Sequence, residues 1–199
     1  MGILGGSRLE RGKGTAEKKS GTLIEFNFVG KKKGKKMRII TGDLITIWQQ
    51  IDCAIGHQCN CKHVMGSGVA QQIRATFPEA FEADLLTDLS KDKLGTFSKG
   101  ISYKSILETA QGKAERRVVV YNIYSQFSLS EKGEDVTCYD CLARGVRAVL
   151  EDIKKEGDYP LCLPYLIGCG LAGGDWKTVE GILLDAEKDE NSEIVLIRR

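Results

Sequence analysis

The sequence has no uninterrupted apolar run that approaches the roughly 20 residues of a membrane-spanning helix. Its N-terminus is positively charged but lacks an apolar core followed by a small-residue cleavage site, so nothing indicates secretion. Hydrophobic residues make up 42% and charged residues 28% of the 199 positions, which is ordinary for a folded domain and not for a disordered chain. We therefore expect a soluble, cytoplasmic, monomeric protein that does not bind a membrane.

The number of cysteines is odd. Seven are present, and an odd number without a secretion signal predicts reduced thiols rather than a disulfide framework. A tetrahedral zinc site is the alternative, and its ligands would come from two short stretches: His57, Cys59, Cys61 and His63 in one, and Cys138 and Cys141 in the other. A single CxxC without a matching pair is a weak metal motif, so we expect no metal and no cofactor.

Positive charge is concentrated at one end of the chain. Residues 1–36 contain ten Lys or Arg and three Glu, a net charge of +7 that leaves −5 for residues 37–199. The sequence predicts a basic leader over residues 1–36, flexible or partly a strand where residues 21–30 alternate, followed by one domain over residues 37–199. Such a leader can bind nucleic acid by neutralising phosphates. Composition favours the alternative, a solvated tail.

From Met37 onward, strand-like and helix-like segments alternate. Strands are expected at 37–40, 53–59, 95–103, 116–124, 161–168 and 192–198. Helices are expected from Gly68 to the break at Pro78, over 79–86, and over 176–188 with Asp175 as N-cap. A further long helix is expected to begin near Cys138 and Cys141, to carry an apolar stripe from Leu142 to Ile153, and to end at Gly157. This alternation predicts a three-layer α/β/α domain with a mixed central sheet.

Two glycine-rich turns each follow a strand and precede a helix, "MGSGVA" at 65–70 and "GCGLAGG" at 168–174. Ligands of open α/β sheets bind where such loops meet the carboxyl ends of strands, and helix N-termini present N–H groups to anions. Neither turn contains the GxxxxGK[ST] pattern of a P-loop. The glycines therefore serve either as tight turns alone or as a cradle for an anion.

The order of "GDLI", "HQCNC" with "MGSGVAQQI", "YNIYSQ" and "LIGCGLAGGDW" resembles that of the macro domain, an ADP-ribose-binding α/β fold. The resemblance spans residues 37–198. It is strongest to the branch with small phage and bacterial macro proteins, the yeast ADP-ribose 1″-phosphate phosphatase and the terminal ADP-ribose protein glutamate hydrolases. It implies binding of ADP-ribose or ADP-ribose 1″-phosphate and dephosphorylation of the latter.

The resemblance also assigns positions to the ligand. Asp43 would accept a hydrogen bond from the adenine amino group, with Leu44 beside the ring. The distal ribose would lie near Asn60, Tyr121, Asn122 and Gln126. The diphosphate would lie between two sets of residues, Gly66, Ser67, Gly68 and Val69 on one side and Gly168, Cys169, Gly170, Leu171 and Ala172 on the other.

Catalytic groups of the family are harder to place on this sequence. The nucleophilic lysine and the acid of the glutamate hydrolases correspond here to Ser125 or Gln126 and to Ala172, and the aspartate that another branch places after its glycines is absent from "GVAQQ". The candidates that remain are His57, Asn60 and Asp175, with a structural histidine and a helix cap as alternatives for the first and last. A non-catalytic ADP-ribose binder and a water-based ADP-ribosyl hydrolase acting on protein or nucleic acid remain the other functional hypotheses.

Overall fold

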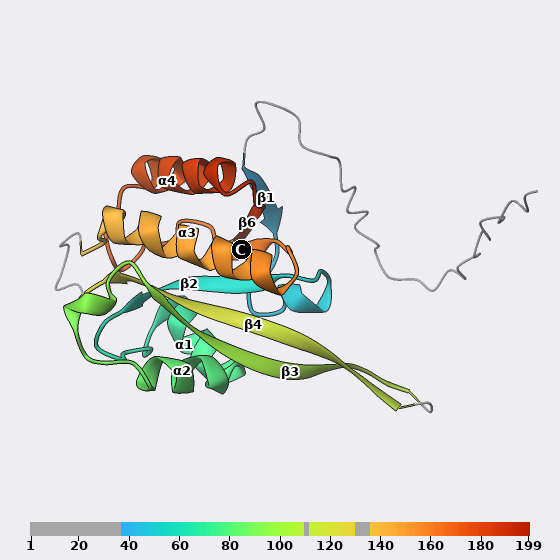
Figure 1. Cartoon of the computed structure of the whole chain (residues 1–199). Helices are drawn as coiled ribbons and strands as arrows, with labels where there is room; N and C mark the ends of the chain where they lie inside the picture. Colours follow the sequence, from blue (N-terminus) through green and yellow to red (C-terminus); the bar gives the residue numbers. More distant parts are fainter. Residues whose placement is uncertain (1–36, 110–111, 130–135) are drawn as a thin grey trace, which may run out of the picture. The chain divides into compact units, whose positions relative to one another are not determined.

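The computed structural model describes residues 37–109, 112–129 and 136–199 (Figure 1). The leader predicted over residues 1–36 lies outside the described residues. Within them, no helix has both the length and the apolar character required to cross a membrane.

The described residues form a six-stranded sheet in the order β1-β6-β5-β2-β4-β3. Neighbouring strands are parallel except for β3 and β4, which are antiparallel and place β3 at one edge. The predicted mixed sheet is therefore confirmed. The strands are β1 Arg38–Thr41, β2 Ala54–Asn60, β3 Phe97–Thr109, β4 Gly112–Gln126, β5 Leu161–Pro164 and β6 Ile194–Arg198.

Helices cover both faces of the sheet, as the three-layer prediction requires (Figure 1). One pair consists of α1 Gly68–Thr76 and α2 Pro78–Leu85, which meet at the expected proline break, and the other of α3 Tyr139–Glu156 and α4 Trp176–Asp189. Two 3₁₀ helices, η1 Ile47–Gln49 and η2 Lys91–Lys93, are not evident from the sequence. The α3 helix buries one apolar stripe and ends at Gly157, as predicted.

Strand β4 supplies side chains to a hydrophobic cluster on each face. Val119 and Ile123 pack in the cluster that includes α3 and α4, whereas Val118 and Val120 pack in the cluster that includes α1 and α2. Successive side chains of a strand point to opposite faces, so a β-branched run suits a strand that is buried on both. Residues 118–125 of β4 are buried, and pairing of this part with β2 positions the carboxyl ends of both strands.

Three strand lengths differ clearly from prediction, and one of them is β3, which continues to Thr109 instead of ending at Tyr103. The β5 strand ends at Pro164 instead of Gly168, because the chain turns through a positive φ of 64° at Leu166. Strand β4 begins at Gly112, earlier than expected, because antiparallel pairing with β3 supplies its backbone hydrogen bonds. The early end of β5 creates an irregular segment, residues 165–175, at the carboxyl edge of the sheet.

The prediction that all cysteines are thiols is wrong at Cys138 and Cys141, which form a disulfide at the start of α3. Their three-residue spacing at a helix start brings the Cα atoms to 5.2 Å, within the range that a disulfide spans. The described residues contain no group of three or more His, Cys, Asp or Glu side chains that could hold a metal ion.

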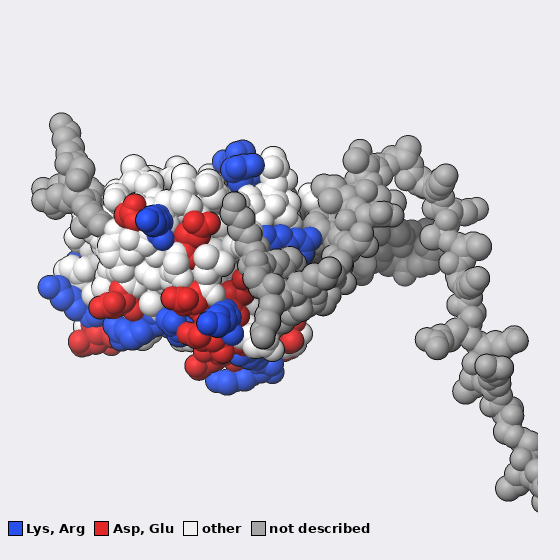
Figure 2. All heavy atoms as spheres, turned by 90° about the horizontal axis from the view of Figure 1, so that it is seen from above, with Lys and Arg blue, Asp and Glu red and all other residues white. Residues whose placement is uncertain are grey.

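Figure 2 looks onto the molecule from the α4 side and shows Lys and Arg side chains interspersed with Asp and Glu. Two ion pairs join α3 to the end of α4, Arg147 with Asp189 at 3.1 Å and Lys154 with Glu190 at 2.9 Å. The described part of this face therefore presents mixed charge rather than a broad basic surface.

Candidate functional site

Two cavities lie at the carboxyl ends of the parallel strands. The distal cavity, about 650 Å³, is lined by residues that include His57, Asn60 and Gln126. The proximal cavity, about 420 Å³, is lined by residues that include Asp43 and Leu44. Both are also lined by a shared set of four residues, Val69, Pro164, Tyr165 and Leu166. We call the two cavities together the groove, because this shared wall makes them adjoin.

The proximal cavity contains a carboxylate whose position is fixed. One oxygen of Asp43, Oδ1, accepts a hydrogen bond from the Ile45 N–H at 3.0 Å, and Oδ2 accepts one from Arg199 at 2.7 Å. Partial burial raises the pKa of Asp43, but the bonds from Ile45 and Arg199 outweigh this effect and lower it. Asp43 is therefore an ionised acceptor on the wall of the proximal cavity.

The first glycine-rich turn, residues 65–70, brings the N-terminus of α1 to the distal cavity. Ser67 is the N-cap, and its side chain makes no capping hydrogen bond. Gly68 follows with a φ of +57°, a conformation that residues with a Cβ rarely adopt. The N–H groups of the first helical turn have no partner within α1 itself. Ser67, Gly68, Val69 and Ala70 all line the distal cavity.

The second turn, residues 168–174, lines the same cavity through Gly168, Gly170, Leu171 and Ala172. A φ of +75° at Gly168 begins a tight loop that closes with a Gly174 N–H to Gly168 carbonyl bond of 2.9 Å. Among the described residues, no backbone carbonyl accepts from the N–H groups of Gly170, Leu171 or Ala172. Two sets of backbone donors thus line one cavity, an arrangement suited to an anion.

His57 lies beneath the distal cavity and is 1% exposed. Its Nε2 is 2.8 Å from Asn122 Oδ1, while the Asn122 amide nitrogen donates to the Ala80 carbonyl and to Ser98 Oγ. Because this nitrogen donates, the Asn122 oxygen accepts, so Nε2 of His57 carries the proton. Burial lowers the pKa of His57 to about 4, so the ring is neutral at pH 7.

Asn60 organises the loop between β2 and α1. Its Oδ1 accepts from the N–H groups of Lys62, at 2.9 Å, and Val64, at 3.3 Å. Its Nδ2 donates to the Val64 carbonyl at 2.7 Å, which among the described residues leaves one amide proton for a ligand. Asn60 therefore shapes the distal cavity and offers it one donor.

Five of the predicted site residues do not line either cavity: Gly66, Tyr121, Asn122, Cys169 and Asp175. Asp175 instead caps α4 by accepting from the Thr178 N–H at 2.8 Å and from its hydroxyl at 2.7 Å, and these bonds lower the pKa of Asp175. This matches the cap alternative and gives no support to a catalytic role.

Tyr121 and Asn122 belong to β4 and lie in the interior of the domain, not on the surface of the groove. Tyr121 faces α3, where its hydroxyl donates to Asp152 at 2.8 Å and its ring packs edge-on against Phe97. Asn122 faces the other way and supports His57. Both side chains are completely buried. The predicted contact of Tyr121 with a ribose therefore has no support in this geometry, and Asn122 acts on the cavity only through His57.

The sequence does not single out several residues that line the groove: Gln58, Gln72, Tyr165, Leu166 and Arg199. Tyr165 and Leu166 read as part of a strand. Arg199 reaches Asp43 only because β1 and β6 pair in parallel. Gln58 could have been noticed in the sequence, because it is a polar residue next to His57 in the strand β2. Its side-chain amide donates a hydrogen bond to Thr137 Oγ1 at 3.2 Å.

Acid–base groups are sparse in the distal cavity. Among its described lining residues, only His57 and Tyr165 have titratable side chains. The cavity can therefore hold an anion through backbone donors, but its described wall presents neither a carboxylate nor a lysine.

Comparison with known proteins agrees with this geometry. Residues 57–183 match the family model "Macro domain", and the chain belongs to this family. It is 31% identical over 153 residues to an uncharacterised 17.5 kDa protein of Enterobacteria phage T4, covering 74% of this chain and 87% of that protein.

Two further comparisons involve Thermosipho africanus. The chain is 30% identical over 125 residues to a DNA ADP-ribosyl transferase–DNA ADP-ribosyl glycohydrolase fusion protein, covering 60% of this chain and 31% of that protein. Its fold is similar to that of T. africanus DarTG in complex with ADP-ribose, with a TM-score of 0.56 and 20% identity over 81% of this chain and 42% of that one.

Proposed function

We propose that the chain binds ADP-ribose along the groove. The observation that carries this proposal is the adjacency of a fixed carboxylate, Asp43, to a cavity lined by two sets of backbone N–H groups. Asp43 would accept from the adenine amino group, and the two glycine-rich turns would bind the diphosphate. Asn60 and Gln126 would face the distal ribose. The ADP-ribose complex of the structurally similar T. africanus protein supports this assignment of ligand.

Calorimetric titration with ADP-ribose tests the binding site. An Asp43→Asn variant keeps the acceptor for Ile45 but loses the charge, and loss of one charge-assisted hydrogen bond is expected to weaken binding by roughly 10- to 100-fold. Asp158→Asn is the matched control, because Asp158 is an exposed residue between α3 and β5, at the opposite end of β5 from the groove. Equal affinity of both variants and the wild type would place the adenine elsewhere.

The reaction we propose is dephosphorylation of ADP-ribose 1″-phosphate. Water attacks phosphorus, the bond between phosphorus and the 1″ oxygen breaks, and ADP-ribose and inorganic phosphate leave. The backbone N–H groups would stabilise the charge that develops on the phosphoryl oxygens. The Nδ1 atom of His57 is the ring nitrogen left to accept a proton, and its low basicity implies a slow reaction.

Hydrolysis of ADP-ribosyl groups from DNA is the second candidate, favoured by the 30% identity to the fusion protein named as a DNA ADP-ribosyl glycohydrolase. The absence of a carboxylate or lysine from the described wall of the distal cavity means that this reaction, too, would depend on water.

Turnover assays distinguish the candidates. Phosphate release from ADP-ribose 1″-phosphate and ADP-ribose release from ADP-ribosylated DNA and protein are measured with the wild type, Asn60→Ala and His57→Gln. Phosphate release that both variants reduce supports the phosphatase, and ADP-ribose release supports the hydrolase. Tight ADP-ribose binding without either product would identify a non-catalytic binder.

A further inference from the structure

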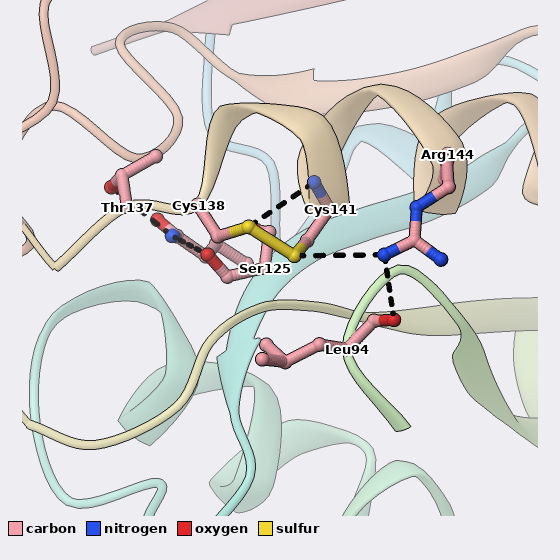
Figure 3. The surroundings of a disulfide bond; sticks show 7 residues. Leu94, Ser125, Thr137, Cys138, Cys141 and Arg144 are labelled. Atoms are coloured by element: carbon pink, nitrogen blue, oxygen red, sulfur yellow. Dashed lines mark hydrogen bonds between the residues drawn. A yellow bond between two sulfur atoms is a disulfide. The ribbon is translucent and has the colours of Figure 1, made fainter. Parts of the chain in front are cut away.

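The disulfide between Cys138 and Cys141 lies in the first turn of α3 (Figure 3). Neither cysteine lines the groove. Cys138 is the N-cap of α3, and its sulfur accepts from the Cys141 N–H at 3.3 Å. The Arg144 guanidinium lies 3.8 Å from the Cys141 sulfur. A helix N-terminus beside one sulfur and a cation beside the other are surroundings that favour thiolate over thiol.

The two sulfurs differ in accessibility. Cys138 is half-buried, whereas Cys141 is only 5% exposed. A small reagent in solution therefore reaches Cys138 first, and Cys141 is placed to resolve the product. Because the cross-link spans only three positions in one helical turn, it stabilises the fold less than a bond closing a long loop.

A buried hydroxyl lies close to the pair. Ser125 lies directly below the disulfide in Figure 3, and its carbonyl accepts from the Cys138 N–H at 2.7 Å. The Ser125 Oγ is buried and has no hydrogen-bond partner among the described residues. Unpaired buried hydroxyls are uncommon because they cost free energy.

We propose that Cys138 and Cys141 form a thiol–disulfide exchange site for small-molecule thiols and disulfides, and that its oxidation state sets the affinity of the groove for ADP-ribose. The second half of this proposal rests on the proposed function, whereas the first half does not.

The exchange is balanced in atoms and electrons. The Cys138 thiolate attacks one sulfur of a small disulfide, the bond between the two small-molecule sulfurs breaks, and one thiolate leaves and takes a proton from water. The Cys141 thiolate then attacks the Cys138 sulfur of the mixed disulfide and expels the second thiolate. The protein dithiol loses two electrons, and the small disulfide gains them as it becomes two thiols.

Two hydrogen bonds connect the segment before the disulfide to the wall of the groove. Thr137, adjacent to Cys138, donates its hydroxyl proton to the Gly168 carbonyl at 2.8 Å, and the Val136 N–H donates to the Ala172 carbonyl at 3.0 Å. Gly168 and Ala172 both belong to the wall of the distal cavity. The disulfide ties this segment to α3, so reduction loosens the support of the second glycine-rich turn.

The experiment uses the full chain, oxidised with glutathione disulfide or reduced with dithiothreitol. Peptide mapping is expected to show a Cys138–Cys141 bond, with loss of two hydrogens, in the first sample and alkylatable thiols at both of these positions in the second. Calorimetry is expected to give about fivefold weaker ADP-ribose binding after reduction. A factor of about five is at the low end of the range by which one site typically changes the affinity of another. Cys138→Ser keeps an N-cap oxygen and should bind equally in both buffers, with the affinity of the reduced wild type.

Failure of the bond to form, failure of dithiothreitol to reduce it, or equal affinity in the two states would each overturn the proposal. If ADP-ribose binds in neither state, the proposed function fails instead. In that case amide hydrogen exchange of residues 168–172 is measured in the oxidised and the reduced protein instead of the affinity. Identical protection in both would show that the disulfide does not affect the second glycine-rich turn.

Discussion

The burial of His57 predicts a specific loss of stability in mild acid. Its pKa falls from 6.5 to about 4 in the folded state, mainly because of burial. Between these values the unfolded chain binds a proton that the folded chain does not, so stability falls as pH falls through this window. Linkage gives a loss of about 2 kcal/mol between pH 7 and pH 5, and about 3 kcal/mol once the pH is below 4.

Urea denaturation of the wild type and of His57→Gln at pH 7 and pH 5 measures this effect. Glutamine keeps a donor for Asn122 Oδ1 and stays neutral at both pH values. Carboxylates with lowered pKa values, such as Glu156 at about 2, are present in both proteins and cancel in the comparison. The wild type is therefore expected to lose about 2 kcal/mol more than the variant.

His63→Gln is the matched control, because it removes the other histidine and leaves His57 in place. It is expected to lose as much stability as the wild type. If the wild type and His57→Gln lose the same amount between pH 7 and pH 5, the buried neutral histidine is refuted, and with it the base that we assign to the distal cavity.

Three further predictions concern loops and a buried charge. Gly168→Ala places a Cβ at a φ of +75° and 3.0 Å from Gln58 Oε1, so urea denaturation should show a loss of about 1–2 kcal/mol and calorimetry weaker ADP-ribose binding. The control Gly181→Ala, in α4 with open space around its Cβ, should instead gain up to about 1 kcal/mol. Lys93→Met leaves the buried Asp84, 3.5 Å from Lys93, without its cation and should cost about 3 kcal/mol at pH 7; a loss below about 1 kcal/mol would contradict this. Asn60→Ala removes three hydrogen bonds in the loop after β2 and should cost about 2 kcal/mol by thermal or urea unfolding, whereas an unchanged stability would show that the loop closes without it.

Local signals in the sequence predict much of the fold. The apolar stripe of α3, the break at Pro78 and the capping residue Asp175 depend on neighbours within a turn or two, and each appears in the structure as expected. The two glycine-rich turns are predictable for the same reason, because Gly68 and Gly168 occupy conformations that favour glycine.

The rest of the site depends on contacts between distant parts of the chain. Arg199 and Asp43 are 156 positions apart, and only the register of β1 with β6 brings them together. The turn at Leu166 is hidden in an apolar stretch that reads as a continuing strand, since nothing local marks its positive φ. The orientation of Tyr121 into the core follows from strand alternation, but its face depends on where α3 packs.

The pairing of β1 with β6 has a consequence for synthesis on the ribosome. Arg38 forms an ion pair with Glu193, 155 positions later, so β1 has no partner strand until β6 has left the exit tunnel. Because such non-local pairing slows folding, the partly made chain exposes an unpaired edge of β5 until β6 emerges. Asp43 lies just beyond β1 and acquires Arg199 as a neighbour only after that pairing, so the proximal cavity is among the last parts of the molecule to form.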